Sequence, residues 1–140
     1  NGSSWRVGVQ HPRMAASHLG VVELTGGWYV ATSGDYERYL IVDGRRYHHI
    51  LNPETGFPSY DDAVASVTVV ARSCLLADAL ATAAFVLGPH RGIEFLQRMN
   101  VHGLVVYAEG GDRESGELTW NATDEFTNLM QPNLDGRPIY

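Results

Sequence analysis

Short segments in which apolar and polar residues alternate dominate the first half of the chain, and this alternation is typical of half-buried β-strands. Two dipeptides, Gly26-Gly27 and Asp43-Gly44, separate neighbouring segments of this kind. Because both favour the tight turn of a β-hairpin, we expect one hairpin around each of them. The predicted strands are residues 5–9, 20–24, 28–32, 39–42 and 46–51.

The second half begins with a strand and continues with helices. Residues 65–71 are almost continuously apolar, which predicts a buried strand. A helix rich in alanine and leucine is expected from its N-cap Ser73 to Leu87, where a Gly-Pro pair follows as a stop signal. The spacing of apolar residues predicts a second helix over residues 91–99.

The remaining part of the chain has the pattern of two strands joined by a polar turn. The strands are expected at residues 102–108 and 117–120, the turn at 109–116, and an irregular tail after Met130. This order of elements predicts an α+β fold with a mainly antiparallel sheet and two helices. Since no linker or repeat interrupts the pattern, residues 1–140 are expected to form a single domain or part of one.

Composition and charge narrow the classes of function. The chain has 140 residues, of which 44% are hydrophobic, and a net charge of −6. The acidic balance argues against a general nucleic-acid binder, because phosphate neutralisation needs a basic surface. All ten positive charges are arginines, which excludes a Schiff-base lysine and the lysine of a phosphate-binding P-loop.

Asp78 and Thr82 lie four residues apart in the first predicted helix, so that both project from one helical face. Their neighbours are mostly alanine, and this leaves an oxygen-lined notch that suits a hard cation such as Mg²⁺. Taken alone, the pattern favours a simpler interpretation, in which Asp78 caps a neighbouring segment and Thr82 bonds to its own helix backbone.

A second group of chemically active residues is His48 and His49, which precede a loop expected over residues 52–62. Strand alternation sends the two imidazoles to opposite faces, so that one can be solvated while the other enters a site. An imidazole is a suitable proton shuttle near neutral pH. Two surface histidines ahead of an ordinary turn fit the same residues.

A third group is the Thr-Ser-Gly sequence at residues 32–34, at the end of a predicted strand. Its hydroxyls and approachable backbone suit a phosphate or a hydroxyl-rich ligand, and a plain turn is equally compatible with these residues. The chain has no glycine-rich dinucleotide fingerprint, no P-loop and no zinc-type cysteine spacing, so the common nucleotide-binding folds gain no support.

In order and spacing, these groups resemble the C-terminal half of the FAD:protein FMN transferases, the ApbE-like flavin transferases. The resemblance spans roughly residues 5–106, and four motifs in one order are specific although each alone is weak. The motifs are Thr32-Ser33-Gly34-Asp35-Tyr36-Glu37-Arg38, His49-Ile50-Leu51-Asn52-Pro53-Glu54-Thr55-Gly56-Phe57-Pro58, Ser66-Val67-Thr68-Val69 and Ala77-Asp78-Ala79-Leu80-Ala81-Thr82-Ala83.

The resemblance implies a Mg²⁺-dependent enzyme that splits the pyrophosphate of FAD, transfers FMN to a threonine or serine hydroxyl of a partner flavoprotein and releases AMP. It also implies the C-terminal portion of the flavin transferase fold, which is T-fold-like. Two alternatives stay open. One is an FAD pyrophosphatase that gives FMN and AMP, and the other is a flavin-binding module without catalytic activity.

The same resemblance assigns roles to residues. Asp78 and Thr82 are implied to hold the metal, and His49, not His48, is implied to be the catalytic group near the flavin. Asn52 stands where the family usually has Asp, which removes a charge beside His49. The residues implied to shape the flavin site are Thr32, Ser33, Gly34, Tyr36, His49, Asn52, Pro53, Thr55 and Gly56.

The N-terminal half of the resembled family carries a Gly-Gly-x-Ala-Lys-Gly segment that contributes a metal ligand and much of the FAD pocket, and nothing in this chain matches it. We therefore expect the chain to be the C-terminal portion of a longer flavin transferase, with the missing half as a partner. Proteins of this family are usually bacterial envelope proteins, often lipid-anchored on the periplasmic side of the inner membrane, and the same location is expected here.

Overall fold

A computed structural model describes residues 4–59, 64–109 and 117–132 of the chain. The strands are β1 (Trp5–Gln10), β2 (His18–Leu24), β3 (Tyr29–Gly34), β4 (Tyr39–Val42), β5 (Arg45–His48), β6 (Val64–Ala71), β7 (His102–Ala108), β8 (Leu118–Ala122) and β9 (Met130–Pro132). The helices are α1 (Cys74–Leu87), α2 (Pro89–Arg98) and α3 (Asp124–Leu129). No helix in the described ranges is long and apolar enough to cross a membrane.

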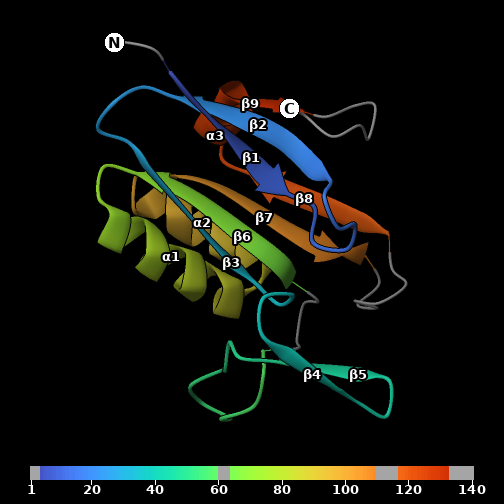
Figure 1. Cartoon of the computed structure of the whole chain (residues 1–140). Helices are drawn as coiled ribbons and strands as arrows, with labels where there is room; N and C mark the ends of the chain where they lie inside the picture. The colour runs from blue at the N-terminus through green and yellow to red at the C-terminus, as the bar shows by residue number, and fades with distance from the viewer. Residues whose placement is uncertain (1–3, 60–63, 110–116, 133–140) are drawn as a thin grey trace.

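The elements form three layers, as Figure 1 shows. Helices α1 and α2 pack on one face of a four-stranded sheet with the strand order β3-β6-β7-β8. The three-stranded sheet β1-β2-β9 and α3 pack against the other face, and the paired strands are antiparallel. The predicted α+β fold with a mainly antiparallel sheet is confirmed, but the described ranges hold three helices, where two were predicted.

Strand β6 is the centre of these layers, because all eight of its residues are buried. Val67 and Val69 face α1 and pack with Phe85 in one hydrophobic core. Val70 belongs to a second core on the opposite face, together with Phe126 of α3. Burial on both faces explains the continuous apolar run, and the predicted buried strand at residues 65–71 is confirmed.

The hairpin predicted around Asp43-Gly44 is confirmed as β4 and β5. Both turn residues have positive φ angles, 49° and 75°, as the tightest hairpin turn requires. In Figure 1 this hairpin stands away from both larger sheets. Its second strand ends at His48, three residues earlier than predicted, and Leu51 forms only an isolated bridge with Pro58.

The hairpin predicted around Gly26-Gly27 is wrong. Strand β2 pairs with β1 and β9, whereas β3 pairs with β6, so the Gly-Gly turn carries the chain from one layer to another. A turn sequence fixes where the chain reverses, but the apolar faces of the two strands decide which partners they take. Val22 and Leu24 of β2 are buried in the second core, and β3 instead lies along β6 and α1.

The C-terminal part of the described chain is more regular than the sequence indicated. Helix α3 was not predicted, although Thr123 is its N-cap and accepts a hydrogen bond from the Phe126 backbone N–H. The irregular tail predicted after Met130 is wrong for residues 131 and 132, which pair with β2 as part of β9. The rest of that tail, most of the turn at 109–116 and the end of the loop at 52–62 lie outside the described residues.

The predicted helices are confirmed. Ser73 is the N-cap of α1, and its hydroxyl accepts a hydrogen bond from the Leu76 backbone N–H. Helix α2 begins at Pro89, two residues before the predicted start. Proline fits the first turn of a helix, where its missing N–H group has no partner to lose, so the same Gly-Pro pair ends one helix and begins the next.

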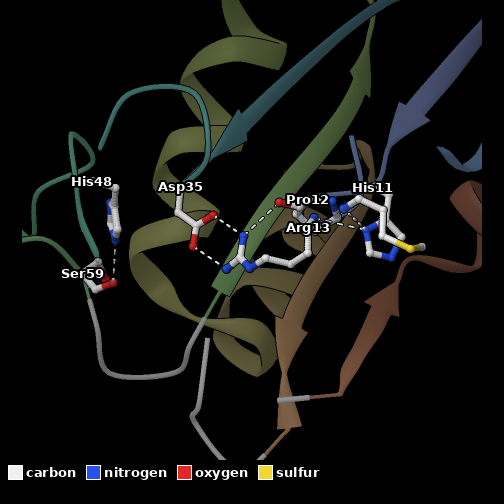
Figure 2. A network of polar contacts seen from close by, with 7 residues as sticks. His11, Pro12, Arg13, Asp35, His48 and Ser59 are labelled. Atoms are coloured by element: carbon white, nitrogen blue, oxygen red, sulfur yellow. Dashed lines mark hydrogen bonds and ion pairs between the residues drawn. The ribbon is translucent and has the colours of Figure 1, made fainter. Parts of the chain in front are cut away.

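An ion pair between a half-buried Arg13 and a buried Asp35 joins the connection between β1 and β2 to the end of β3 (Figure 2). Two guanidinium nitrogens of Arg13 donate to the two carboxylate oxygens of Asp35, each at 2.7 Å. The loop that carries Arg13 is shaped by His11, whose Nδ1 accepts hydrogen bonds from the backbone N–H groups of Arg13 and Met14 at 3.1 Å. Because Nδ1 accepts twice, this loop requires the neutral imidazole.

This loop predicts a pH-dependent stability. Burial, and then the positive charge of Arg13, lower the pKa of His11 below its ordinary value of 6.5. The unfolded chain therefore binds a proton at His11 more readily, and the stability that the neutral imidazole supplies is lost as the pH falls below about 6.5 and through the lower folded pKa. In urea titrations at a series of pH values, the free energy of unfolding should fall as the pH is lowered from 7.5 to 5.

His11→Asn is the control for this prediction, because Asn Oδ1 can accept the same two hydrogen bonds and does not titrate. The difference in free energy of unfolding between the wild-type chain and this variant should change with pH over the same range. A difference that stays constant from pH 7.5 to 5 would show that His11 does not shape the loop in this way.

Candidate functional site

A hollow of about 280 Å³ opens where β3, α1 and the segment after β5 meet. It brings together six of the residues that the sequence singled out, namely Thr32, Ser33, Gly34, His49, Asp78 and Thr82. Glu37, Ile50 and Leu51 complete its lining. Residues up to 50 positions apart in the sequence therefore share one small, open site.

The packing of β3 and α1 on the same buried strand explains why these residues meet. Strand β3 pairs with β6 in a register that sets Gly34 opposite Ser66, and α1 lies along both strands. The Ser33 hydroxyl faces the helix, where its oxygen lies 2.9 Å from Thr82 Oγ1. Two sides of the site are thus formed by β3 and α1, which also pack in the hydrophobic core.

The simpler interpretation of the Asp78 and Thr82 pair is confirmed for Thr82 only. The Thr82 hydroxyl donates to the Asp78 backbone carbonyl at 3.3 Å, so Ser33 donates to the Thr82 oxygen. The Asp78 carboxylate is exposed and, within the part of the chain that the structure describes, caps no segment and forms no ion pair. This leaves the carboxylate available to a ligand in the hollow.

The donor set of this hollow fits Mg²⁺. Asp78 supplies a carboxylate, and Ser33 and Thr82 supply hydroxyl oxygens, which are the hard ligands that Mg²⁺ prefers. Among the described residues there is no group of three or more His, Cys, Asp or Glu side chains that could enclose a metal ion. A cation here would need further oxygen ligands from water or from a phosphate, as is usual for Mg²⁺.

His49 and His48 have opposite environments, as strand alternation predicts, although His48 is buried rather than solvated. The Nε2–H of His48 donates to the Ser59 carbonyl, and its Nδ1 accepts from the Ile50 backbone N–H. His48 also lies edge-on to Phe85, with ring centroids 5.4 Å apart, so its role is structural. The interpretation as two surface histidines is therefore wrong for His48.

His49 is exposed and lines the hollow. Its Nδ1 lies 3.1 Å from the Arg38 backbone carbonyl, and a carbonyl oxygen only accepts hydrogen bonds, so Nδ1 carries a proton. In the neutral ring the lone pair is then on Nε2. The hydrogen bond to Arg38 also fixes the orientation of the ring, which is what a positioned proton acceptor requires.

Glu37 is the residue of this site that sequence reasoning missed. It belongs to the quoted motif and follows Gly34 by three positions, but no role was assigned to it. Glu37 and His49 also line a second, more open hollow of about 510 Å³ beside the β4–β5 hairpin. The two hollows therefore adjoin at a carboxylate and an imidazole.

Five residues that the sequence assigned to the flavin site lie outside the lining of the first hollow. Asn52 and Thr55 accept hydrogen bonds from the backbone N–H groups of Glu54 and Phe57, so their side chains shape the loop. Asn52 thus forms the turn through a side chain that carries no charge. The assignments outside the lining, which stay predictions, are Tyr36, Asn52, Pro53, Thr55 and Gly56.

Tyr36 packs against Gly34, where a Cβ atom would lie 2.5 Å from the tyrosine ring. A larger residue at position 34 would therefore force the Tyr36 ring to shift. Burial, together with the carboxylates of Glu37 and Asp35, raises the pKa of Tyr36 to about 12. The phenol stays protonated at neutral pH, so that it can donate a hydrogen bond but cannot act as a phenolate.

Known proteins are similar to this chain in sequence and in fold. The chain is 40% identical over 133 residues to an FAD:protein FMN transferase of Escherichia coli K12, which covers 95% of this chain and 34% of the relative. It is 37% identical over 106 residues to an FAD:protein FMN transferase of Vibrio cholerae, covering 76% of this chain and 31% of the relative. The chain thus spans about a third of the length of these curated relatives.

Solved structures agree with the sequence comparison. The ApbE protein of Thermotoga maritima matches 92% of this chain and 39% of its own, with a TM-score of 0.77 and 38% identity. The flavinyl transferase ApbE of Pseudomonas stutzeri matches 91% of this chain and 37% of its own, with a TM-score of 0.68 and 39% identity. The ApbE family itself matches residues 1–105. The predicted relationship and fold are confirmed, and this chain belongs to the ApbE family.

Proposed function

We propose that this chain forms part of an FAD:protein FMN transferase and carries one side of its active site. The observation that carries the proposal is the hollow in which Ser33 and Thr82 lie 2.9 Å apart, with Asp78 and His49 on its lining. Curated relatives over 30% identical to this chain are named FAD:protein FMN transferases, which supports FAD as the substrate.

We propose Asp78 and Thr82 as the residues that hold a Mg²⁺ ion. When bound, such an ion would neutralise negative charge that develops on the phosphates during pyrophosphate cleavage. The chain has no lysine that could supply this charge instead. The Ser33 hydroxyl, which donates to Thr82, orients the threonine oxygen toward the same hollow.

His49 is the proposed proton acceptor. A threonine or serine hydroxyl of an acceptor flavoprotein is a weak nucleophile until a base takes its proton. The hydrogen bond from Nδ1 to Arg38 leaves the Nε2 lone pair for that task and holds the ring in place. Transfer of FMN to the hydroxyl oxygen then releases AMP as the leaving group.

The flavin-binding roles of Tyr36, Asn52, Pro53, Thr55 and Gly56 belong to the same proposal. The chain spans about a third of its relatives, so we propose that a further part of the protein completes the FAD pocket. We also propose a location on the periplasmic side of a bacterial inner membrane with a lipid anchor. This location follows from the family resemblance alone.

The metal assignment predicts that FAD binding depends on Asp78. The wild-type protein, including the further part that completes the FAD pocket, should bind FAD more tightly with Mg²⁺ than without it in a fluorescence titration. Asp78→Asn should abolish this difference and weaken FAD binding at least tenfold with Mg²⁺ present, because the carboxylate is the one charged ligand offered by Asp78 and Thr82. Equal affinities of both proteins for FAD would contradict the assignment.

Glu94→Gln is the matched control, because Glu94 is an exposed carboxylate on α2 that does not line the hollow. Its removal changes the net charge by the same amount as Asp78→Asn. The control should therefore bind FAD with Mg²⁺ as the wild-type protein does.

The role of His49 predicts a loss of rate without a loss of binding. His49→Gln should slow AMP release from FAD by about 10² or more, which is the usual contribution of a general base, while FAD affinity changes less than threefold. AMP is measured by chromatography, and transfer by FMN fluorescence of the acceptor protein after denaturing electrophoresis. His90→Gln, at an exposed position on α2, should leave both readouts unchanged.

Two results would redirect the proposal. AMP release without a labelled acceptor protein would favour the FAD pyrophosphatase, in which water replaces the hydroxyl. An unchanged rate for His49→Gln would remove the imidazole from the reaction.

A further inference from the structure

The residue that follows the Ser33-Gly34 part of the candidate site is a carboxylate with no solvent exposure. The Asp35 side chain is 0% exposed and the Arg13 side chain 16% exposed. Both carboxylate oxygens accept from Arg13 at 2.7 Å, in the two-pronged geometry that only a guanidinium offers. The Asp35 backbone N–H also donates to the Ala65 carbonyl at 3.0 Å. Asp35 is therefore held through its side chain and its backbone.

The segment around Asp35 is closely packed at Gly34. Gly34 is buried, and the Tyr36 ring occupies the space that a Cβ atom at position 34 would need. Ser33, two residues before Asp35, makes the hydrogen bond to Thr82, and Glu37, two residues after it, lines both hollows. A displacement of Asp35 would therefore be passed on to groups on the lining of the site.

Arg13 reaches Asp35 from another layer of the fold. It lies in the connection between β1 and β2 of the three-stranded sheet, whereas Asp35 follows β3 of the four-stranded sheet. Figure 2 shows the guanidinium extending across to the carboxylate, with its Nη1–H also donating to the Pro12 carbonyl at 3.1 Å. The hydrogen bonds of His11 hold the loop that presents it.

We propose that Arg13 is a positioning residue of the candidate site. By clamping Asp35, it fixes the end of β3, so that the Ser33 hydroxyl stays against Thr82 and Glu37 stays on the hollow. Arg13 itself does not line the hollow, so it acts through Asp35 and not by touching a ligand. The inference rests on the proposed function, which supplies FAD with Mg²⁺ as the ligand of the site. The ordering of residues 33–37 by Arg13 can be measured without that ligand.

A double substitution separates positioning from mere stabilisation. Removing one partner of a buried ion pair leaves an uncompensated charge, whereas replacing both by apolar residues of similar size often preserves stability. We therefore choose Arg13→Met with Asp35→Leu, and measure the urea midpoint of unfolding, amide hydrogen exchange, and the affinity for FAD with Mg²⁺. The urea midpoint reports global stability, and amide exchange reports local order. The FAD affinity reports whether the candidate site keeps its geometry.

The proposal expects the double variant to unfold near the wild-type urea midpoint. Exchange at residues 33–37 should be at least 30-fold faster, with unchanged exchange in α1, and FAD affinity should fall at least tenfold. A folded double variant with wild-type exchange at 33–37 and wild-type FAD affinity would overturn the proposal, because the pair would then serve stability alone.

If the double variant does not fold, the single substitution Arg13→Lys tests the positioning role instead. Lysine keeps the positive charge but cannot form the two parallel hydrogen bonds. Faster exchange confined to residues 33–37 supports positioning, and equally faster exchange in α1 and β6 overturns it. If the wild-type protein, with the further part that completes the FAD pocket, shows no Mg²⁺-dependent FAD binding, the proposed function fails, while the exchange data still decide whether Arg13 positions this segment.

Discussion

The burial of β6 on both faces is the constraint on which the rest of this structure depends. Apolar surface gains about 25 cal/mol for each Å² removed from water, so a strand with eight buried residues must be covered on each side. Helix α1 covers one face and the β1-β2-β9 sheet lies on the other. Since β3 pairs with β6 and α1 packs across both, the distance between Ser33 and Thr82 is fixed by the core.

The candidate site shows a division between groups that are free to meet a ligand and groups that are committed to the fold. Asp78 and His49 are exposed on the lining of the hollow, whereas His48 and Asp35 nearby are buried. His48, beside His49, has hydrogen bonds at both ring nitrogens. The buried Asp35, next to Gly34, is neutralised by Arg13. The proposed phosphate-cleaving function would benefit from such an arrangement, because preorganised groups lose less of their binding energy to reorganisation.

The sequence predicted those parts of the fold that depend on residues close together in the chain. The Asp43-Gly44 turn, the Ser73 N-cap and the buried strand at 65–71 depend on the nearest residues, and motif order was sufficient to indicate the family. The failures are non-local. The Gly26-Gly27 turn does not say which strand β3 pairs with, and the pairing of residues 130–132 with β2 spans most of the chain. Neither the Arg13–Asp35 pair nor the place of Glu37 between two hollows follows from spacing, since each depends on how separate layers meet.

The most direct test of the central claim, that Ser33, His49, Asp78 and Thr82 form one phosphate-cleaving site, is to locate a bound metal. Mn²⁺ replaces Mg²⁺ at oxygen sites and broadens the NMR signals of nearby nuclei. Titrated with FAD into the protein that contains this chain and the rest of the FAD pocket, it should first broaden the amide signals of these four residues, which come from β3, α1 and the segment between β5 and β6. Broadening centred elsewhere, for example on Asp124 and Glu125 of α3, or spread evenly over the chain, would contradict the account.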